Sequence, residues 1–303
     1  MNVNHASYHP SVLLAGFVLL LPMARELPAG EPVRHRILMV EYNPAGKHRL
    51  LEVSPDGQLD WQHDTPGLCV QFERLPNGHI LYGYGGKSTG AQEIDRDGKV
   101  IWSYRSHCPE ALCFDRLENG NTLIVETTPL QVVTVNSAGQ VVETLPLTTT
   151  DTNFHSQVRR IQRLENGNTL AALSGEGVAR EFRPDGSVAW DWGHARWLFQ
   201  ALRLPDGNTL ISCGTDNRLV DVDAAGKIVW ELKPDDIPEV GMIWPTSVEV
   251  LPNGNLLVAN FLHGRKEPGA HCFEVTRQKD VVWQFADRSL VNAIVQVSII
   301  DDK

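Results

Sequence analysis

The chain has 303 residues, of which 42% are hydrophobic and 21% are charged. This composition is too apolar for a disordered protein and is sufficient for one large globular domain or two small ones. Because 37 acidic residues outnumber 27 basic ones and give a formal net charge of -10, the sequence does not favour nucleic acid or an anionic membrane as a partner.

The N-terminal region contains an apolar segment, VLLAGFVLLLPM at 12–23. Such a run is shorter than the roughly 20 residues that a bilayer span requires, but it has the length of a signal-peptide hydrophobic region. The residues before it include His5 and His9 but no lysine or arginine, and an apolar N-terminal strand is the alternative. We predict a signal peptide and leader over residues 1–30, export to the periplasm or the extracellular space, and no stable membrane span in the mature chain.

From residue 36 onward, strand patterns alternate with short turns, beginning with RILMVEY at 36–42. One recurring turn places a glycine four residues before a tryptophan. The pairs are Gly57–Trp61, Gly98–Trp102, Gly186–Trp190 and Gly226–Trp230, with Lys279 in the glycine's place before Trp283 and Glu143 in the tryptophan's place after Gly139.

A second recurring turn has the form Leu-x-Asn/Asp-Gly. Its glycines are separated by 42, 47, 40 and 47 residues and are Gly78, Gly120, Gly167, Gly207 and Gly254. Asn-Gly and Asp-Gly between alternating apolar runs are strong hairpin signals, because both central residues of the favoured turn take positive φ. Each of these turns therefore predicts the tip of a β-hairpin.

One repeat unit, read from Phe199, contains four strand patterns, FQALRL, TLISC, RLVDVD and IVWEL. A period of 40–47 residues with four strands indicates a propeller blade, and the period-two alternation excludes helical repeats. The final segment, VNAIVQVSII at 291–300, has the pattern of the first strand of a repeat unit, but no second strand follows it. RILMVEY has the pattern of a second strand, but no first strand precedes it. We predict one all-β domain over residues 31–303. It is a six-bladed β-propeller of four-stranded blades, closed by pairing of the C-terminal strand with the N-terminal strand, and the recurring tryptophan packs each blade on the next.

The turns resemble those of two known propeller families. DRDGKVIW (95–102), DAAGKIVW (223–230) and SPDGQLDW (54–61) are similar to the tryptophan-docking repeats of pyrroloquinoline-quinone-type propellers, the quinoprotein family, and LPNGNLLV (251–258) resembles the hairpins of arylsulfotransferase-like propellers. The first resemblance implies a quinone near two adjacent cysteines, a pair that this chain lacks. The second implies a histidine nucleophile about eight residues before the hairpin glycine. The residues at that place are Val70, Leu112, Arg159, Phe199 and Thr246.

A column of mostly polar residues is predicted to line the central channel. In a propeller the first strand of each blade faces the axis, and the loop-rich face forms the mouth where ligands bind. The residues seven positions before the hairpin glycines, with the equivalent residue of the last strand, are Gln71, Cys113, Arg160, Gln200, Ser247 and Gln296. Since dry burial would leave such groups unpaired, we expect them to face water, in a solvated tunnel or a ligand site.

Histidines concentrate in the loops of the predicted mouth, which hold seven of the 11. His107 is one of these, and His155 and His194 stand closest to the first strands. Imidazole can act as a general base, a nucleophile or a metal ligand. The alternative for each of them is an ordinary surface position, because most loop residues carry no chemistry.

Two tryptophans enter successive first strands at equivalent places. Trp197 and Trp244 each lie ten residues before a hairpin glycine. They could stack on a sugar or aryl ring while Arg160 and Arg196 hold a sulfate or carboxylate. Hydrophobic plugs between loops are the alternative reading.

The leading hypothesis for function is a noncatalytic module that binds a ligand or a protein through the channel mouth, because the catalytic marks of both families are missing. The alternative is an arylsulfotransferase-like or other enzyme that acts on an anionic aryl or glycan substrate, with His155 or His194 as base or nucleophile. A third is a protein that organises a cell-envelope complex through its flat faces. No cofactor or metal site is predicted. Pyrroloquinoline quinone and divalent metals have no supporting motif, since C-x-x-C and H-x-x-H spacings are absent. The expected partners are a small anionic molecule, a glycan or a protein.

Overall fold

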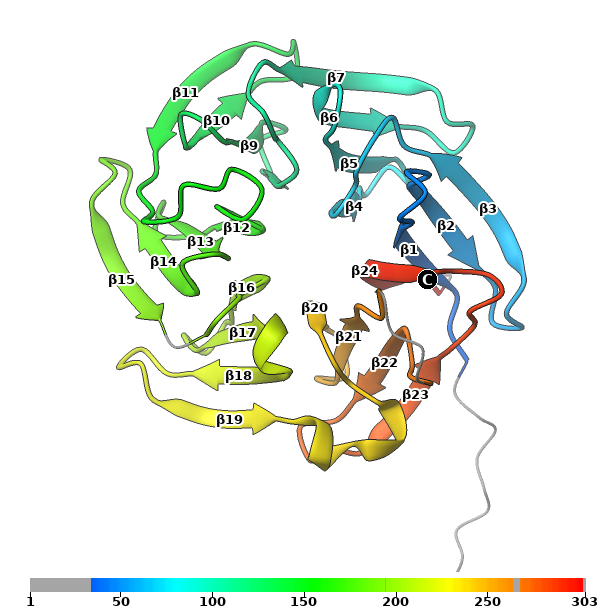
Figure 1. Cartoon of the computed structure of the whole chain (residues 1–303). Helices are drawn as coiled ribbons and strands as arrows, with labels where there is room; N and C mark the ends of the chain where they lie inside the picture. Colours follow the sequence, from blue (N-terminus) through cyan, green and yellow to red (C-terminus); the bar gives the residue numbers. More distant parts are fainter. Residues whose placement is uncertain (1–33, 194, 264–267, 302–303) are drawn as a thin grey trace, which may run out of the picture. The chain divides into compact units, whose positions relative to one another are not determined.

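The computed structural model describes residues 34–193, 195–263 and 268–301. Residues 33–303 form one compact unit, in which six four-stranded antiparallel sheets surround a central axis as the blades of a propeller (Figure 1). The predicted all-β, six-bladed fold is therefore confirmed. The leader predicted over residues 1–30 lies outside the described residues, and no described helix is long and apolar enough to cross a membrane.

Each blade runs from an innermost strand at the channel to an outermost strand at the rim. Blade 1 consists of β24 (Ala293–Ile299), β1 (Ile37–Tyr42), β2 (Arg49–Val53) and β3 (Leu59–Asp64), blade 2 of β4 (Phe72–Arg74), β5 (Ile80–Tyr84), β6 (Thr89–Ile94) and β7 (Val100–Ser106), and blade 3 of β8 (Phe114–Arg116), β9 (Thr122–Glu126), β10 (Gln131–Val135) and β11 (Val141–Pro146). Blade 4 consists of β12 (Arg160–Arg163), β13 (Thr169–Leu173), β14 (Val178–Phe182) and β15 (Val188–Gly193), blade 5 of β16 (Gln200–Arg203), β17 (Thr209–Cys213), β18 (Arg218–Val222) and β19 (Ile228–Leu232), and blade 6 of β20 (Pro245–Val250), β21 (Leu256–Asn260), β22 (Cys272–Val275) and β23 (Val281–Phe285). Three single-turn 3₁₀ helices, η1 (Gly214–Asp216), η2 (Pro234–Asp236) and η3 (Pro238–Val240), lie in connections.

The ring is closed in blade 1 by the two ends of the domain. Strand β24 pairs antiparallel with β1, and Val297 lies opposite Met39 in the register. The predicted pairing of the C-terminal and N-terminal strands is therefore confirmed. Closure leaves no open sheet edge at the junction between the first and last blades.

The hairpin tips form a three-residue loop instead of the expected turn. In the β4–β5 hairpin, Leu75 N–H donates to the His79 carbonyl at 2.9 Å, and Gly78 N–H donates to the Leu75 carbonyl at 2.9 Å. Gly78 has φ +83°, whereas Asn77 does not have a positive φ. The expectation that both central residues take positive φ is therefore wrong, because a three-residue loop needs only one residue in the left-handed region. Lys279, which stands in a glycine's place, adopts that conformation with φ +74°.

Tryptophans on the outermost strands join neighbouring blades, as predicted. Their indole N–H groups donate to a backbone carbonyl in the outer hairpin of the next blade. The pairs are Trp61 with Arg96 at 2.9 Å, Trp102 with Asn136 at 3.2 Å and Trp230 with Arg277 at 2.8 Å. The same contact therefore recurs at three blade junctions, which accounts for the regular spacing of tryptophan in the sequence.

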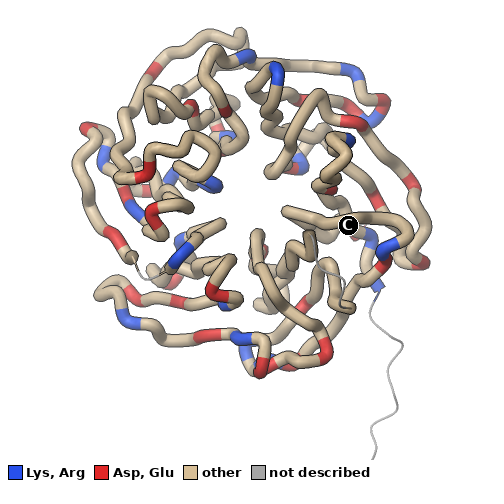
Figure 2. Tube along the Cα trace, viewed as in Figure 1, with Lys and Arg blue, Asp and Glu red and all other residues tan. Residues whose placement is uncertain are grey.

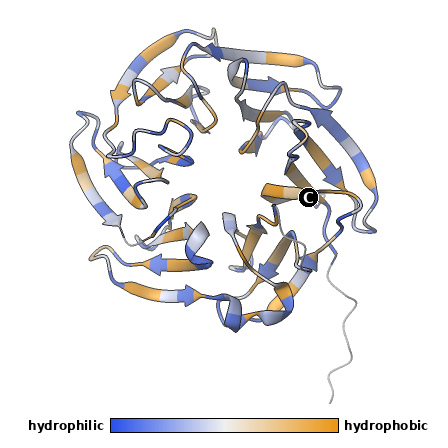
Figure 3. Cartoon of the chain, in the orientation of Figure 1, coloured by the Kyte–Doolittle hydropathy of each residue, from blue (hydrophilic) through white to orange (hydrophobic). Residues whose placement is uncertain are grey.

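Burial is greatest in the middle strands of the blades and least in the outermost strands, while innermost strands such as β4 and β16 are only partly buried. The second strands of blades 2–6 are buried at every residue, whereas the outermost strands expose residues such as Val142 and Val229. Figure 3 shows hydrophobic and hydrophilic residues alternating along the strands, and Figure 2 shows both signs of charge spread around the ring.

Candidate ligand site in the central channel

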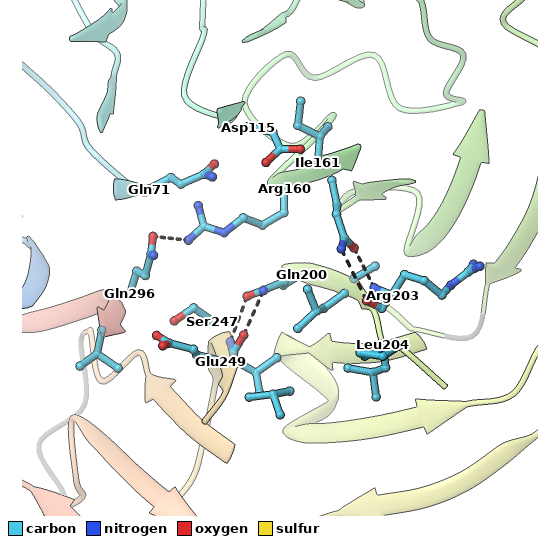
Figure 4. Close-up of a pocket in the computed structure, with 17 residues that line it drawn as sticks. Gln71, Asp115, Arg160, Ile161, Gln200, Arg203, Leu204, Ser247, Glu249 and Gln296 are labelled. Carbon is cyan, nitrogen blue, oxygen red and sulfur yellow. Dashed lines mark hydrogen bonds between the residues drawn. The ribbon is translucent and has the colours of Figure 1, made fainter. Parts of the chain in front are cut away.

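The central channel contains two cavities separated by a narrow segment. The loop-side cavity, of about 280 Å³, is lined by Tyr42, Leu68, Val70, His155, Arg159, Trp197, Phe199, Trp244, Thr246, Phe261, His263 and Val295. The hairpin-side cavity, of about 590 Å³, lies toward the inner hairpins and includes Gln71, Asp115, Arg160, Gln200, Ser247, Glu249 and Gln296 in its lining (Figure 4). The constriction between them holds only about 10 Å³ and is lined by Val70, Arg159, Arg160, Phe199, Thr246 and Val295.

A belt of aromatic rings in mutual contact lines part of the loop-side cavity. The Trp244 ring lies 5.6 Å from Phe261 at 88° and 5.8 Å from Phe199 at 82°, which are edge-to-face contacts. The Phe199 ring lies 6.4 Å from Trp197, and Tyr42 continues the belt at 5.5 Å from Phe261. The indole nitrogens of Trp197 and Trp244 are buried without a hydrogen-bond partner among the described residues. The belt therefore presents apolar ring surface to the cavity, while the indole nitrogen of Trp244 lies against Gly214.

Two successive arginines stand at the constriction. Arg159 and Arg160 are 7% and 8% exposed, and burial lowers the pKa of both, that of Arg160 to about 10. Arg160 Nη2 donates to the Val70 carbonyl at 3.1 Å and to Gln296 Oε1 at 2.8 Å, and Figure 4 shows its side chain pointing to Gln296 across the channel. The Arg159 guanidinium makes no hydrogen bond or ion pair with any described residue, and its Nη1 is fully buried.

The predicted glutamine column is bonded within the protein. Each amide exchanges two hydrogen bonds with one backbone position on the innermost strand of the next blade. Gln296 bonds Phe72 at 2.9 and 3.0 Å, Gln71 bonds Phe114 at 2.8 and 3.1 Å, and Gln200 bonds Val248 at 3.0 and 2.9 Å. The prediction that this column lines the channel is confirmed, because the partly buried Gln71, Gln200 and Gln296 belong to the wall of the hairpin-side cavity, and the same amides also join neighbouring blades. Their contact with a ligand remains a prediction.

Several carboxyl groups on the hairpin side have raised pKa values. Burial raises the pKa of Glu73 to about 7, with a further rise from the nearby Asp115 carboxyl, and raises the pKa of Asp115 to about 6. Burial also raises the pKa of Glu249, which accepts a hydrogen bond from Ser298 Oγ at 2.8 Å. The wall of the hairpin-side cavity includes the carboxyl groups of Asp115 and Glu249, whereas no described Asp or Glu lines the loop-side cavity.

His155 stands in the wall of the loop-side cavity beside an acidic partner. Its Nδ1 lies 2.7 Å from Glu110 Oε1, and its side chain is 46% exposed. The carboxylate orients the ring and leaves Nε2 for another partner. The structure thus brings three predicted residues, His155, Trp197 and Trp244, to one cavity.

The other predicted site residues lie elsewhere. Arg196 has a side chain that is 81% exposed and forms an ion pair with Asp216 at 3.0 Å, and neither channel cavity includes it. His107 is exposed and also lies outside both cavities. Ser247 and Arg160 line the hairpin-side cavity, and His194 lies outside the described residues.

Sequence reasoning missed several residues of the loop-side cavity. Arg159 and Phe199 occupy the column eight positions before the hairpin glycine, and they were inspected there only for a histidine nucleophile. Arg159 and Phe199 could have been identified in the sequence as a charged and a bulky residue directly beside the polar column. Tyr42 ends β1 and Phe261 follows β21, where no repeat marks them, whereas His263, also after β21, is one of the seven histidines predicted in the mouth loops.

The residues present do not favour the cofactors that the resemblance implies. The described residues contain no group of three His, Cys, Asp or Glu side chains that could hold a metal ion. Pyrroloquinoline quinone carries several carboxylates, whereas the described part of the loop-side cavity offers a single unengaged guanidinium, that of Arg159. We derive no step through either group.

Comparison with known proteins establishes the fold. No protein-family model and no curated protein matches the chain. A crystal structure of a protein of unknown function from Bacteroides caccae is 24% identical, with a TM-score of 0.77 over 87% of this chain and 98% of that one. A catalytically inactive virginiamycin B lyase from Staphylococcus aureus with quinupristin is 10% identical, with a TM-score of 0.55 over 84% of this chain and 85% of its own. The WD40 propeller domain of Doa1 is 14% identical, with a TM-score of 0.56 over 75% and 72% of the two chains. The neighbours are β-propellers.

Proposed function

We propose that this protein is a ligand-binding propeller that takes a small ring-bearing molecule into the loop-side cavity. The observation that carries the proposal is the belt of aromatic rings in the wall of a cavity of about 280 Å³, close to the lower end of the roughly 300–1,000 Å³ typical of ligand pockets. Such a cavity suits one or two fused rings. Edge-to-face contacts already fix the walls, so a ring can enter a preorganised site.

The turn repeats support a relationship to quinoprotein-like and arylsulfotransferase-like propellers at the level of architecture. The apolar segment at 12–23 supports export, which would place the protein in the periplasm or outside the cell. In that setting a binding propeller would meet extracellular small molecules, glycans or proteins directly.

Binding of a neutral aromatic probe tests this proposal. Methyl 2-naphthoate is titrated into the protein by calorimetry, and Trp244→Ala is expected to weaken binding by about tenfold or more, since a stacked aromatic contact contributes about 0.5–1.5 kcal/mol beyond buried area. Phe154→Ala is the matched control, because Phe154 is 43% exposed and outside the cavity. Absence of binding to methyl 2-naphthoate and to the naphthoate anion would sink the proposal.

A second candidate is the enzyme alternative, which the His155–Glu110 pair favours. A carboxylate-bound imidazole in a cavity wall is a suitable general base or nucleophile, and a lyase among the structural neighbours supports this only at the level of the fold. An anionic aryl or glycan substrate would lie in the loop-side cavity. Turnover of aryl sulfates or acidic glycans that is lost in His155→Gln, with ligand binding kept, would favour this candidate over simple binding.

A further inference from the structure

We propose that the ligand of the loop-side cavity is an anion and that Arg159 is the residue that selects it. The proposal rests on the proposed binding function and names the chemical class of the ligand. The ligand expected is an aryl carboxylate, sulfonate or sulfate. Its ring would contact the aromatic belt, and its charged group would reach the floor of the cavity.

The first argument is the unused hydrogen-bonding capacity of Arg159. This residue directly precedes β12, and its backbone is held by a bond from its N–H to the Ala172 carbonyl at 3.0 Å. Its side chain lines both the loop-side cavity and the constriction. It is 7% exposed, its Nη1 is buried without a partner, and no described residue hydrogen-bonds the guanidinium. Buried charges in proteins are normally paired, so a partner from outside the chain is expected.

The neighbouring Arg160 shows that the site could have satisfied a guanidinium internally. Arg160 Nη2 bonds the Val70 carbonyl and Gln296 Oε1 and belongs to the lining of the hairpin-side cavity. Arg160 is therefore partly engaged in the wall, although its Nη1 is also unpartnered. The two guanidinium groups add positive potential at the constriction, because no described carboxylate bonds either of them.

The charges that face Arg159 from the loop side are also favourable to an anion. No Asp or Glu lines the loop-side cavity. The acid that acts on Arg159 through space is Glu110, and its Oε1 is already 2.7 Å from His155 Nδ1. His155 and His263 are the other ionisable bases in the wall, and neither opposes an anion.

The shape of the channel sets the orientation of the ligand. The constriction holds about 10 Å³, too little for a ring or a sulfonate, so a ligand that enters from the mouth stops at Arg159. A planar guanidinium pairs with two oxygens of one carboxylate or sulfonate at once. The ring of the ligand is then level with Phe199, Trp244 and Phe261, which line the same cavity.

A matched pair of probes tests the inference. Methyl 2-naphthoate and sodium 2-naphthoate share the ring and differ in charge. By calorimetry at constant ionic strength, the wild-type protein is expected to bind the anion at least tenfold more tightly than the ester. Arg159→Met is expected to lose about 10- to 100-fold of affinity for the anion, the range for a hydrogen bond to a charged group, with affinity for the ester unchanged.

Control variants separate the outcomes. Arg159→Lys keeps the charge and is expected to retain part of the preference, while Arg74→Met, at an exposed position on the hairpin side, is expected to change nothing. Equal binding of both probes that Arg159→Met leaves unaltered would overturn the anion inference while the binding function stands. Loss of the preference in Arg196→Met but not in Arg159→Met would also overturn it. Failure of both probes to bind would overturn both proposals, and melting curves of every variant exclude misfolding as the cause.

Discussion

Replacing Arg159 by methionine is expected to stabilise the protein in the absence of ligand. The substitution removes a buried guanidinium with no hydrogen-bond partner among the described residues and inserts a flexible apolar side chain among Val70, Phe199 and Val295. An unsatisfied buried polar group costs about 1–3 kcal/mol, and replacing buried charge by apolar side chains is often stabilising. At about 2–4 °C per kcal/mol for a domain of this size, the melting temperature should rise by about 2–12 °C.

The matched comparison is Arg160→Met, made at the next residue. This variant removes the hydrogen bonds to the Val70 carbonyl and Gln296 Oε1, so its melting temperature should lie at or below that of the wild type. Calorimetric melting in a chloride buffer is the assay, because sulfate or phosphate could bind the native state and stabilise it by mass action. A fall of the melting temperature by more than about 2 °C in Arg159→Met would refute the reasoning and assign Arg159 a structural partner.

Two further predictions concern the hairpin side of the channel. Gln296→Leu should lower the free energy of unfolding by about 3 kcal/mol, since it removes two hydrogen bonds to the Phe72 backbone and one of the two hydrogen bonds of Arg160 Nη2, at about 1 kcal/mol each. Gln200→Leu breaks two such bonds and should lower the free energy of unfolding by about 2 kcal/mol. Urea unfolding measures both variants. Equal losses of stability in the two variants, or negligible losses in both, would contradict this account. The pKa of Glu73 is raised to about 7 in the folded state. The folded protein therefore binds a proton at Glu73 more tightly than the unfolded chain does. This contribution to stability is fully present below the pKa of Glu73 in the unfolded chain and is lost as the pH rises through about 7. Glu73→Gln should therefore be more stable than the wild type at pH 8 and lose this advantage at pH 5. A constant difference between these pH values would argue against the shift.

The fold could be predicted from the sequence because its repeats encode local geometry. Gly78 and its counterparts mark where the chain must take a positive φ, and Lys279 shows that the position, rather than the residue, recurs. Trp61 and Trp102 mark contacts between blades. The closure of blade 1 followed from counting strands, since β1 and β24 each lacked a partner within their own repeat.

The loop-side cavity was only partly predictable. Trp197 and Trp244 could be found because both precede a strand at a fixed distance from its hairpin. Tyr42 and Phe261 could not, because they come from different blades and meet through the closure of the ring. Arg159 was passed over because its column was inspected only for a histidine nucleophile, whereas the structure places Arg159 and Arg160 at the same constriction.

The glutamine column explains why a polar pattern alone does not identify a binding residue. Innermost strands of adjacent blades do not pair with one another in the described sheets, so their facing peptide groups need other partners. A glutamine amide carries a donor and an acceptor, as a peptide group does, and Gln71 and Gln200 each supply both to one backbone position of the next blade. Sequence shows that such a side chain needs a partner, and only the packed structure shows whether the protein provides it. The protein provides partners for these amides. The described part of the chain provides no hydrogen-bond partner for the Arg159 guanidinium. Arg159 is therefore a better candidate for contact with a ligand than the glutamines are.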